Sequence, residues 1–209
     1  HGLGRVDFSL TGGDAGTLIG AGEMTADLMG DQARVVVRLP SIGALVNADV
    51  ATASPYDYKA TAVLDRLELA RLAPLLDAVE AEILGFASGT VTASGRFADA
   101  LDRVAIVNLT ELDAGIGGVP VTLNAPANLV LRGDDVTLKD LNVRIGSGRL
   151  TASGEWNTKL DGAFQGQFTG EFQDAIRMGR AMGVPPTHDG SAPLSLDLRS
   201  KGSRAGTLA

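Results

Sequence analysis

The chain has 209 residues, 44% hydrophobic and 21% charged, so it can bury a substantial core and does not have the composition of a disordered protein. A net charge of −7 opposes the counterion release that drives binding to nucleic acids, and the lack of cysteine excludes disulfides and thiolate chemistry. Only 4% of residues are aromatic while 27 are glycine, which suits many short, curved strands.

One nine-residue pattern recurs along the chain, at residues 16–24 (GTLIGAGEM), 89–97 (GTVTASGRF) and 148–156 (GRLTASGEW). A truncated copy, GTLA, occupies residues 206–209. Such near-regular recurrence indicates a repeat architecture. We therefore interpret residues 1–209 as one continuous fragment of a longer repeat protein.

Each copy alternates between apolar and polar residues, which is typical of a half-buried strand. In the third copy, Leu150, Ala152, Gly154 and Trp156 share one face. The order large, small, glycine, large recurs in the other copies, and a glycine inside a strand permits a bend or a bulge. The pattern predicts strands that curve.

A first helix is predicted at about residues 66–84, between two strand series. Asp65 and Glu68 have the spacing of a capping box, and Gly85 follows as a stop. The apolar residues expected on one face of this helix are Leu75, Leu76, Val79 and Ile83.

A second helix is predicted at about residues 174–183. Asp174 is its expected N-cap, and Gly183, Pro185 and Pro186 form a stop.

The rest of the chain reads as strands separated by turn sequences such as MGDQ, GIGG, RGDD and GSG. Short strands at this spacing predict an antiparallel meander. The expected fold class is mostly β, an elongated and curved antiparallel repeat sheet, or repeating β-groove, with two short helices.

The sequence offers little catalytic chemistry. His188 lies in a loop sequence, and Asp134 with Asp135 reads as a hairpin turn rather than a metal pair. Ser94 and Ser153 fall on the polar side of the alternation, and no nucleophile elbow, zinc motif or phosphate-binding loop is present in the sequence. We expect no enzymatic activity, no catalytic residues, no metal and no cofactor.

An apolar stripe recurs on the predicted strands. It fits the inner face of an ordinary sandwich or barrel, but few aromatics, many small residues and open-ended repetition favour an open groove that holds an apolar ligand. The residues predicted to line this groove are Leu18, Met24, Val91, Ala93, Phe97, Leu150, Ala152, Trp156, Phe164 and Phe168.

The strand series punctuated by GTVTASG and GRLTASG, together with the segment LARLAPLL at residues 69–76, resembles the TamB and AsmA-like family of envelope proteins from diderm bacteria. The resemblance covers essentially the whole chain and includes TamB, AsmA and YhdP types. It implies a periplasmic segment of an inner-membrane-anchored protein, whose apolar groove carries phospholipid acyl chains between the inner and outer membranes. It also implies a TamA-like or BAM-like outer-membrane barrel as partner, bound through regions outside this fragment.

Two alternatives remain open at the level of sequence. A scaffold for the assembly of outer-membrane β-barrels would use the edges of the same sheet to hold strands. A purely structural solenoid would need neither edge nor groove. Because sheet edges present unpaired backbone groups, we also expect the fragment to self-associate.

Overall fold

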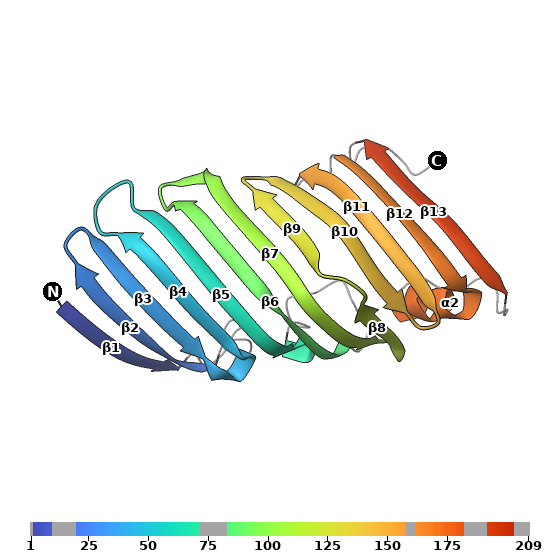
Figure 1. Ribbon diagram of the computed structural model, residues 1–209, viewed down its shortest axis with the longest axis horizontal. Helices are drawn as coiled ribbons and strands as arrows, with labels where there is room; N and C mark the ends of the chain where they lie inside the picture. The colour runs from blue at the N-terminus through green and yellow to red at the C-terminus, as the bar shows by residue number, and fades with distance from the viewer. Residues whose placement is uncertain (1, 10–19, 72–82, 158–161, 182–191, 203–209) are drawn as a thin grey trace.

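The computed structural model describes residues 2–9, 20–71, 83–157, 162–181 and 192–202 and shows one long antiparallel sheet (Figure 1). The first strands are β1 (Gly2–Ser9), β2 (Ala21–Met29), β3 (Gln32–Leu39), β4 (Ala44–Ala51), β5 (Asp57–Glu68), β6 (Ile83–Arg96) and β7 (Asp99–Ile116). The remaining strands are β8 (Val119–Leu123), β9 (Ala127–Arg132), β10 (Asp135–Ile145), β11 (Gly148–Asn157), β12 (Gly162–Glu171) and β13 (Pro193–Gly202).

The strands lie side by side almost in chain order, so β1 and β13 lie at opposite ends of the sheet (Figure 1). The exception is the pair β8 and β9, which follow one another and both lie between β7 and β10. The sheet therefore has twelve strand positions and spans about 50 Å across its strands. The predicted mostly-β, antiparallel fold class is confirmed.

The predicted turns form where the sequence places them. Gly30, Gly117, Gly133 and Gly146 all have positive φ between consecutive strands, which glycine adopts without strain. The RGDD sequence, with Asp134, is thus a hairpin turn between β9 and β10.

The repeated sequences fall on equivalent strands. In the first copy, residues 21–24 lie in β2. In the second copy, residues 89–96 lie in β6, and the third copy, residues 148–156, lies in β11. Because β8 and β9 share one position, these three strands are each four positions apart and run in the same direction. Residues 206–209 lie outside the described residues.

The helix predicted at 66–84 is wrong at both ends. Strand β5 continues through Glu68, a 3₁₀ turn occupies residues 69–71, and β6 begins at Ile83. Asp65 and Glu68 are therefore strand residues rather than a capping box, and Gly85 lies inside β6 rather than after a helix. The middle of the prediction, residues 72–82, lies outside the described residues.

The second helix exists as α2, which spans Phe172–Ala181. It begins two residues before the predicted start, so Asp174 lies inside its first turn and is not the N-cap. Residues 182 and 183 lie outside the described residues. A further short helical element, the 3₁₀ turn η1 (Pro40–Ile42), links β3 to β4.

Three strands carry an irregularity at a Leu-x-x-Leu sequence. The register shifts between Leu64 and Leu67 in β5, and between Leu138 and Leu141 in β10. In each case the residue before the second leucine, Arg66 or Asp140, has a positive φ of 52°. The third sequence, residues 109–112 in β7, lies at a register shift opposite β6. Each extra residue bends its strand and returns the second leucine to the same face as the first.

The sheet has no second sheet packed against it among the described residues (Figure 1). The accessible surface is 13032 Å², whereas a compact globular protein of 21.5 kDa exposes about 9,200 Å². A single extended layer exposes more surface than a compact fold, which accounts for the larger accessible area.

Candidate functional site: the apolar face of the sheet

The strand register places apolar residues opposite apolar residues over the whole length from β2 to β12. Residues directly opposite in an antiparallel pair lie on the same face, and successive residues of a strand alternate between faces. One continuous row shows the pattern from β2 to β6: Met24, Val37, Val46, Ala62, Val91.

A second row crosses the other half of the sheet through Leu123, Val143, Leu150 and Phe168. Neighbouring rows contain Ala48, Ala60, Ala93 and Ala105, and Leu141, Ala152 and Gly166. We call this side of the sheet the apolar face.

The predicted lining residues lie together on the apolar face where the structure describes them. Met24 is on β2, Val91 and Ala93 on β6, Leu150, Ala152 and Trp156 on β11, and Phe164 and Phe168 on β12. Ala152 and Phe168 are buried, and the others are half-buried.

Two predicted lining residues differ from this set. Leu18 lies outside the described residues. Phe97 follows β6, and its ring lies 4.6 Å from the ring of Tyr58, between centroids, while 56% of the residue stays exposed. Tyr58 stands opposite Val50 and Gly95 on the apolar face, so the sequence prediction missed an aromatic member of this surface. Its alternation with Ala60 and Ala62 is the signal that identifies it.

One long edge of the apolar face is covered. The turn η1, residues 69–71 and helix α2 all lie at this edge, where β3, β5 and β12 end (Figure 1). Most of the buried residues in the described part of the chain lie near it, including Leu39, Leu67, Val119 and Ile145. We call it the covered edge.

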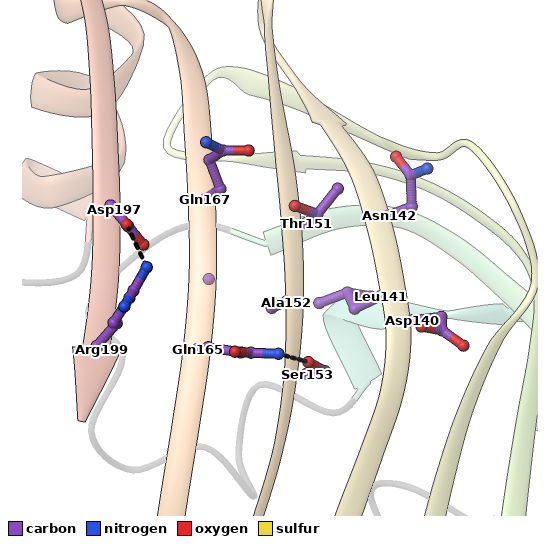
Figure 2. Close-up of a pocket in the computed structure, with 11 residues that line it drawn as sticks. Asp140, Leu141, Asn142, Thr151, Ala152, Ser153, Gln165, Gln167, Asp197 and Arg199 are labelled. Carbon is purple, nitrogen blue, oxygen red and sulfur yellow. Dashed lines mark hydrogen bonds and ion pairs between the residues drawn. The ribbon is translucent and has the colours of Figure 1, made fainter. Parts of the chain in front are cut away.

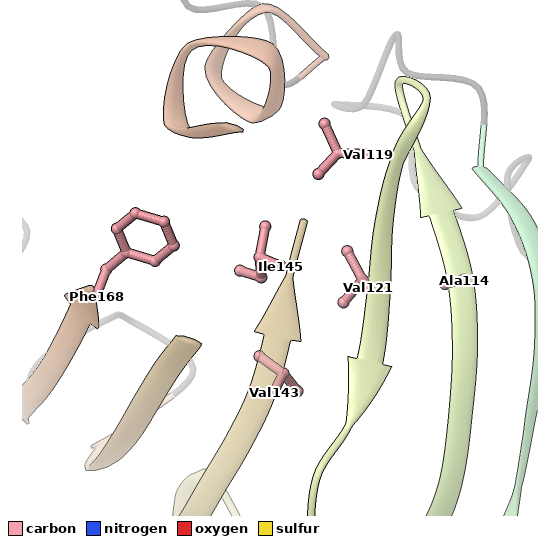
Figure 3. Packing of buried hydrophobic residues seen from close by; sticks show 6 residues of the cluster. All are labelled: Ala114, Val119, Val121, Val143, Ile145 and Phe168. Atoms are coloured by element: carbon pink, nitrogen blue, oxygen red, sulfur yellow. The ribbon is translucent and has the colours of Figure 1, made fainter. Parts of the chain in front are cut away.

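The largest buried cluster sits beneath α2 at this edge (Figure 3). Its members come from β7, β8, β10 and β12: Ala114, Val119, Val121, Val143, Ile145 and Phe168. Leu69, which follows β5, packs against the cluster from a distant part of the sequence.

The opposite long edge, formed by the turns that follow β2, β4, β6 and β9, is more open. Leu28 near this edge is 49% exposed. Trp156 and Phe164 line a small, predominantly apolar hollow of about 240 Å³ there. The apolar face is thus closed along one side and accessible along the other.

The other face of the sheet is polar and carries cross-strand ion pairs. Glu23 lies 3.5 Å from Arg5 and 3.6 Å from Arg38, so three adjacent strands are joined, and Arg34 lies 3.2 Å from Asp49. The pKa of Arg96 is raised by its hydrogen bond to Asp102 and by the charge of that carboxylate. We call this side the polar face.

A depression of about 450 Å³ lies on the polar face over β10 to β13 (Figure 2). Gln165 donates a hydrogen bond to the Ser153 hydroxyl there, and Arg199 pairs with Asp197. These exposed groups satisfy one another, and Ser153 lies on the polar side as predicted. Ser94, opposite Lys59, does the same on β6.

Helix α2 is attached to the sheet through Asp174. Its carboxylate accepts hydrogen bonds from the backbone N–H of Ser147, at 2.8 Å, and from the Ser147 hydroxyl, at 2.7 Å. These bonds lower the pKa of Asp174, with a smaller contribution from the positive charge of Arg177. This contact is not visible in the sequence, because Asp174 and Ser147 are 27 residues apart.

The described residues contain no group of three acidic or histidine side chains placed to hold a metal ion. His188 lies outside the described residues. Within the part of the chain that the structure describes, no helix is both long and apolar enough to cross a membrane.

Comparison of the chain with protein-family models, with curated proteins and with solved structures found no match. The geometry of the sheet is therefore the basis for assigning a function to the chain.

Proposed function

We propose that the apolar face is a β-groove that shields phospholipid acyl chains from water, and that the chain is a segment of a lipid-carrying bridge of the TamB and AsmA-like type. The observation that carries the proposal is the continuity of apolar residues from β2 to β12 on a single-layer sheet. A sheet normally buries its apolar face against another layer, and an uncovered apolar face this long is typical of a binding surface.

The energetics favour an acyl chain as the occupant. Exposing about sixteen methylene groups to water costs roughly 13 kcal/mol at about 0.8 kcal/mol per CH₂. A uniform apolar surface offsets most of this cost without fixing the chain at one position. The Ala-rich rows at Ala48, Ala60, Ala93 and Ala105 provide such a surface, because small side chains leave no deep pocket.

The proposal includes the elongated, curved shape of a β-groove and the place of the protein in the cell. Three bulged strands and the covered edge give the sheet a bent cross-section with one side closed. A periplasmic bridge anchored in the inner membrane, working with a TamA-like or BAM-like barrel, would use such a segment between the two membranes.

The test is photocrosslinking with matched positions on neighbouring residues of the same strands. A benzophenone amino acid replaces Trp156 or Phe164 on the apolar face, and Glu155 or Gln165 on the polar face. The chain is incubated with phosphatidylethanolamine and phosphatidylglycerol vesicles, irradiated and analysed by mass spectrometry. We expect lipid adducts at positions 156 and 164 at least about fivefold above those at 155 and 165, since only the first pair faces the groove.

Equal labelling on the two faces would contradict the proposal. The alternative, a scaffold that holds strands of outer-membrane proteins, is supported by the sheet edges. Among the described residues β1 pairs only with β2, and β13 only with β12. If the chain is such a scaffold, crosslinking probes in β13 would capture polypeptide, and probes on the apolar face would capture no lipid.

A further inference from the structure

The corner of the apolar face next to α2 is buried more deeply than a single-layer sheet explains. Val119 on β8 is 1% exposed, and Ile145 and Phe168 are 7% and 6% exposed. On a sheet without a second layer, a side chain is buried this deeply only where other elements lie over it, and Leu69, which follows β5, also packs against this cluster. Helix α2 contacts both β8 and β12, and Figure 3 shows it across this corner.

The helix is amphipathic in a way that fits this position. Phe172 and Ile176 are one turn apart and half-buried, whereas Gln173, Arg177 and Arg180 are exposed. A helix with one apolar stripe is stable when that stripe packs on an apolar surface. Because α2 contacts β8 and β12, its position across this corner covers apolar surface that would otherwise continue the groove.

The attachment of α2 to the neighbouring hairpin is small and polar. Asp174 accepts both hydrogen bonds from Ser147 in the turn between β10 and β11. Gly146 in the same turn has φ of +58°, and a side-chain carbon there would overlap the Asp174 carboxylate. Beyond this contact, the Phe172 N–H donates to the carbonyl of Ala192, which ties the helix start to the beginning of β13.

We propose that α2 is a lid over the end of the apolar face, held closed by the hydrogen bonds between Asp174 and Ser147. When these bonds break, the helix lifts and the surface formed by Val119, Ile145 and Phe168 becomes part of the accessible groove. The opening and closing of α2 does not depend on the function proposed above, whereas its role in controlling lipid entry rests on that function.

The lid is tested first without any lipid. Because the chain has no cysteine, a Val119→Cys variant carries a single thiol under α2. Its rate of modification by N-ethylmaleimide, followed by mass spectrometry, reports how often the corner opens. Adding Asp174→Ala should raise the rate roughly tenfold or more, because two hydrogen bonds to a carboxylate are lost. Ser147→Ala, which keeps the backbone N–H, should raise it less.

A matched thiol separates lid opening from general loosening. Ala44 is 8% exposed at the same long edge but lies beside η1, far from α2. The modification rate of an Ala44→Cys variant should not change on adding Asp174→Ala. An unchanged rate at position 119, or an equal increase at both positions, would overturn the lid.

A disulfide tests whether the lid controls the groove. Ser147→Cys with Asp174→Cys should fix α2 in place when oxidised, and Ser153→Cys with Gln165→Cys provides an equivalent cross-link on the polar face. Loading of fluorescent phosphatidylethanolamine from vesicles should slow at least about threefold in the first oxidised variant and not in the second. If loading is equal with and without this cross-link, the controlling role is wrong. If thiol modification behaves as expected but neither variant loads lipid in either redox state, the lid stands and the proposed lipid function fails.

Discussion

The two faces of this sheet are formed by the same strands but carry side chains of opposite character. On the polar face, charges on adjacent strands are matched in pairs, as at Arg34 and Asp49 or around Glu23. On the apolar face, register partners from β2 to β12 are aliphatic, aromatic or glycine, and the buried residues in the described part of the chain include no polar side chain. The side chains of the polar face are satisfied in contact with water, whereas the apolar face is stabilised by contact with another apolar surface.

The contrast between the faces indicates which residues contribute most to the stability of the chain. Cross-strand ion pairs on exposed surfaces contribute little each, whereas burial of apolar area contributes most of the free energy of folding. The apolar face is buried along the covered edge and half-buried elsewhere. Substitutions should therefore have large effects on one face near that edge, and small effects on the other face of the same strands.

The largest effect is expected for a charge under the covered edge. Val121 on β8 is 5% exposed within the buried cluster, so Val121→Asp should lower the free energy of unfolding by about 3 to 5 kcal/mol. Chemical denaturation followed by circular dichroism measures the change.

The neighbouring residue provides the control. Thr122 lies on the polar face between Arg144 and Asp113, whose opposite charges offset one another at a new carboxylate, so Thr122→Asp should change the stability by less than about 0.5 kcal/mol. Similar losses for both variants would show that the two faces of β8 are not distinguished as the register requires.

Two phenylalanines on the apolar side should lose stability unequally, one about as much as Val121→Asp and the other much less. Phe168 is 6% exposed near the covered edge, and Phe168→Ala should cost about 3 to 5 kcal/mol because it leaves a cavity. Phe97 is 56% exposed and contacts the ring of Tyr58, so Phe97→Ala should cost only about 1 kcal/mol. Thermal unfolding of the two variants compares them directly, and equal losses would mean that the open side is buried as deeply as the covered side.

The alternation of residues predicted the strands and the faces, because a period of two is visible within a few residues. The same rule failed where a bulge interrupts the period. Leu64 and Leu67 are three residues apart, which is also the spacing of a helical face, and Asp65 with Glu68 mimics a capping box. The positive φ of Arg66 resolves the ambiguity in favour of a bulged strand, and a single sequence does not contain that information.

The composition of the apolar face was predictable, but its boundaries were not. The alternation placed Ala152, Trp156, Phe164 and Phe168 on one face, as the register shows. It gave no signal for α2 over Val119, because that contact joins segments about fifty residues apart in the sequence. It also gave no signal for the sharing of one position by β8 and β9, which depends on how β7 and β10 pair across the gap.

The smallest measurable loss of stability is expected at the centre of an ion-pair network on the polar face. Glu23 lies between Arg5 and Arg38 at 3.5 and 3.6 Å, and the two arginine side chains are 63% and 58% exposed. Glu23→Gln should therefore lower the free energy of unfolding by only about 0.5 to 1 kcal/mol in dilute buffer. Urea denaturation at low ionic strength measures this loss.

Salt separates the electrostatic part of this effect from any change in packing. Charges on a solvated face are screened within about 8 to 10 Å at physiological ionic strength and more strongly in molar salt, so the difference between Glu23→Gln and the parent should shrink below about 0.3 kcal/mol in 1 M sodium chloride. A loss above about 2 kcal/mol that persisted in salt would mean that Glu23 packs as a core residue. The contrast between the faces would then fail at the N-terminal end of the sheet, where the network joins β1, β2 and β3.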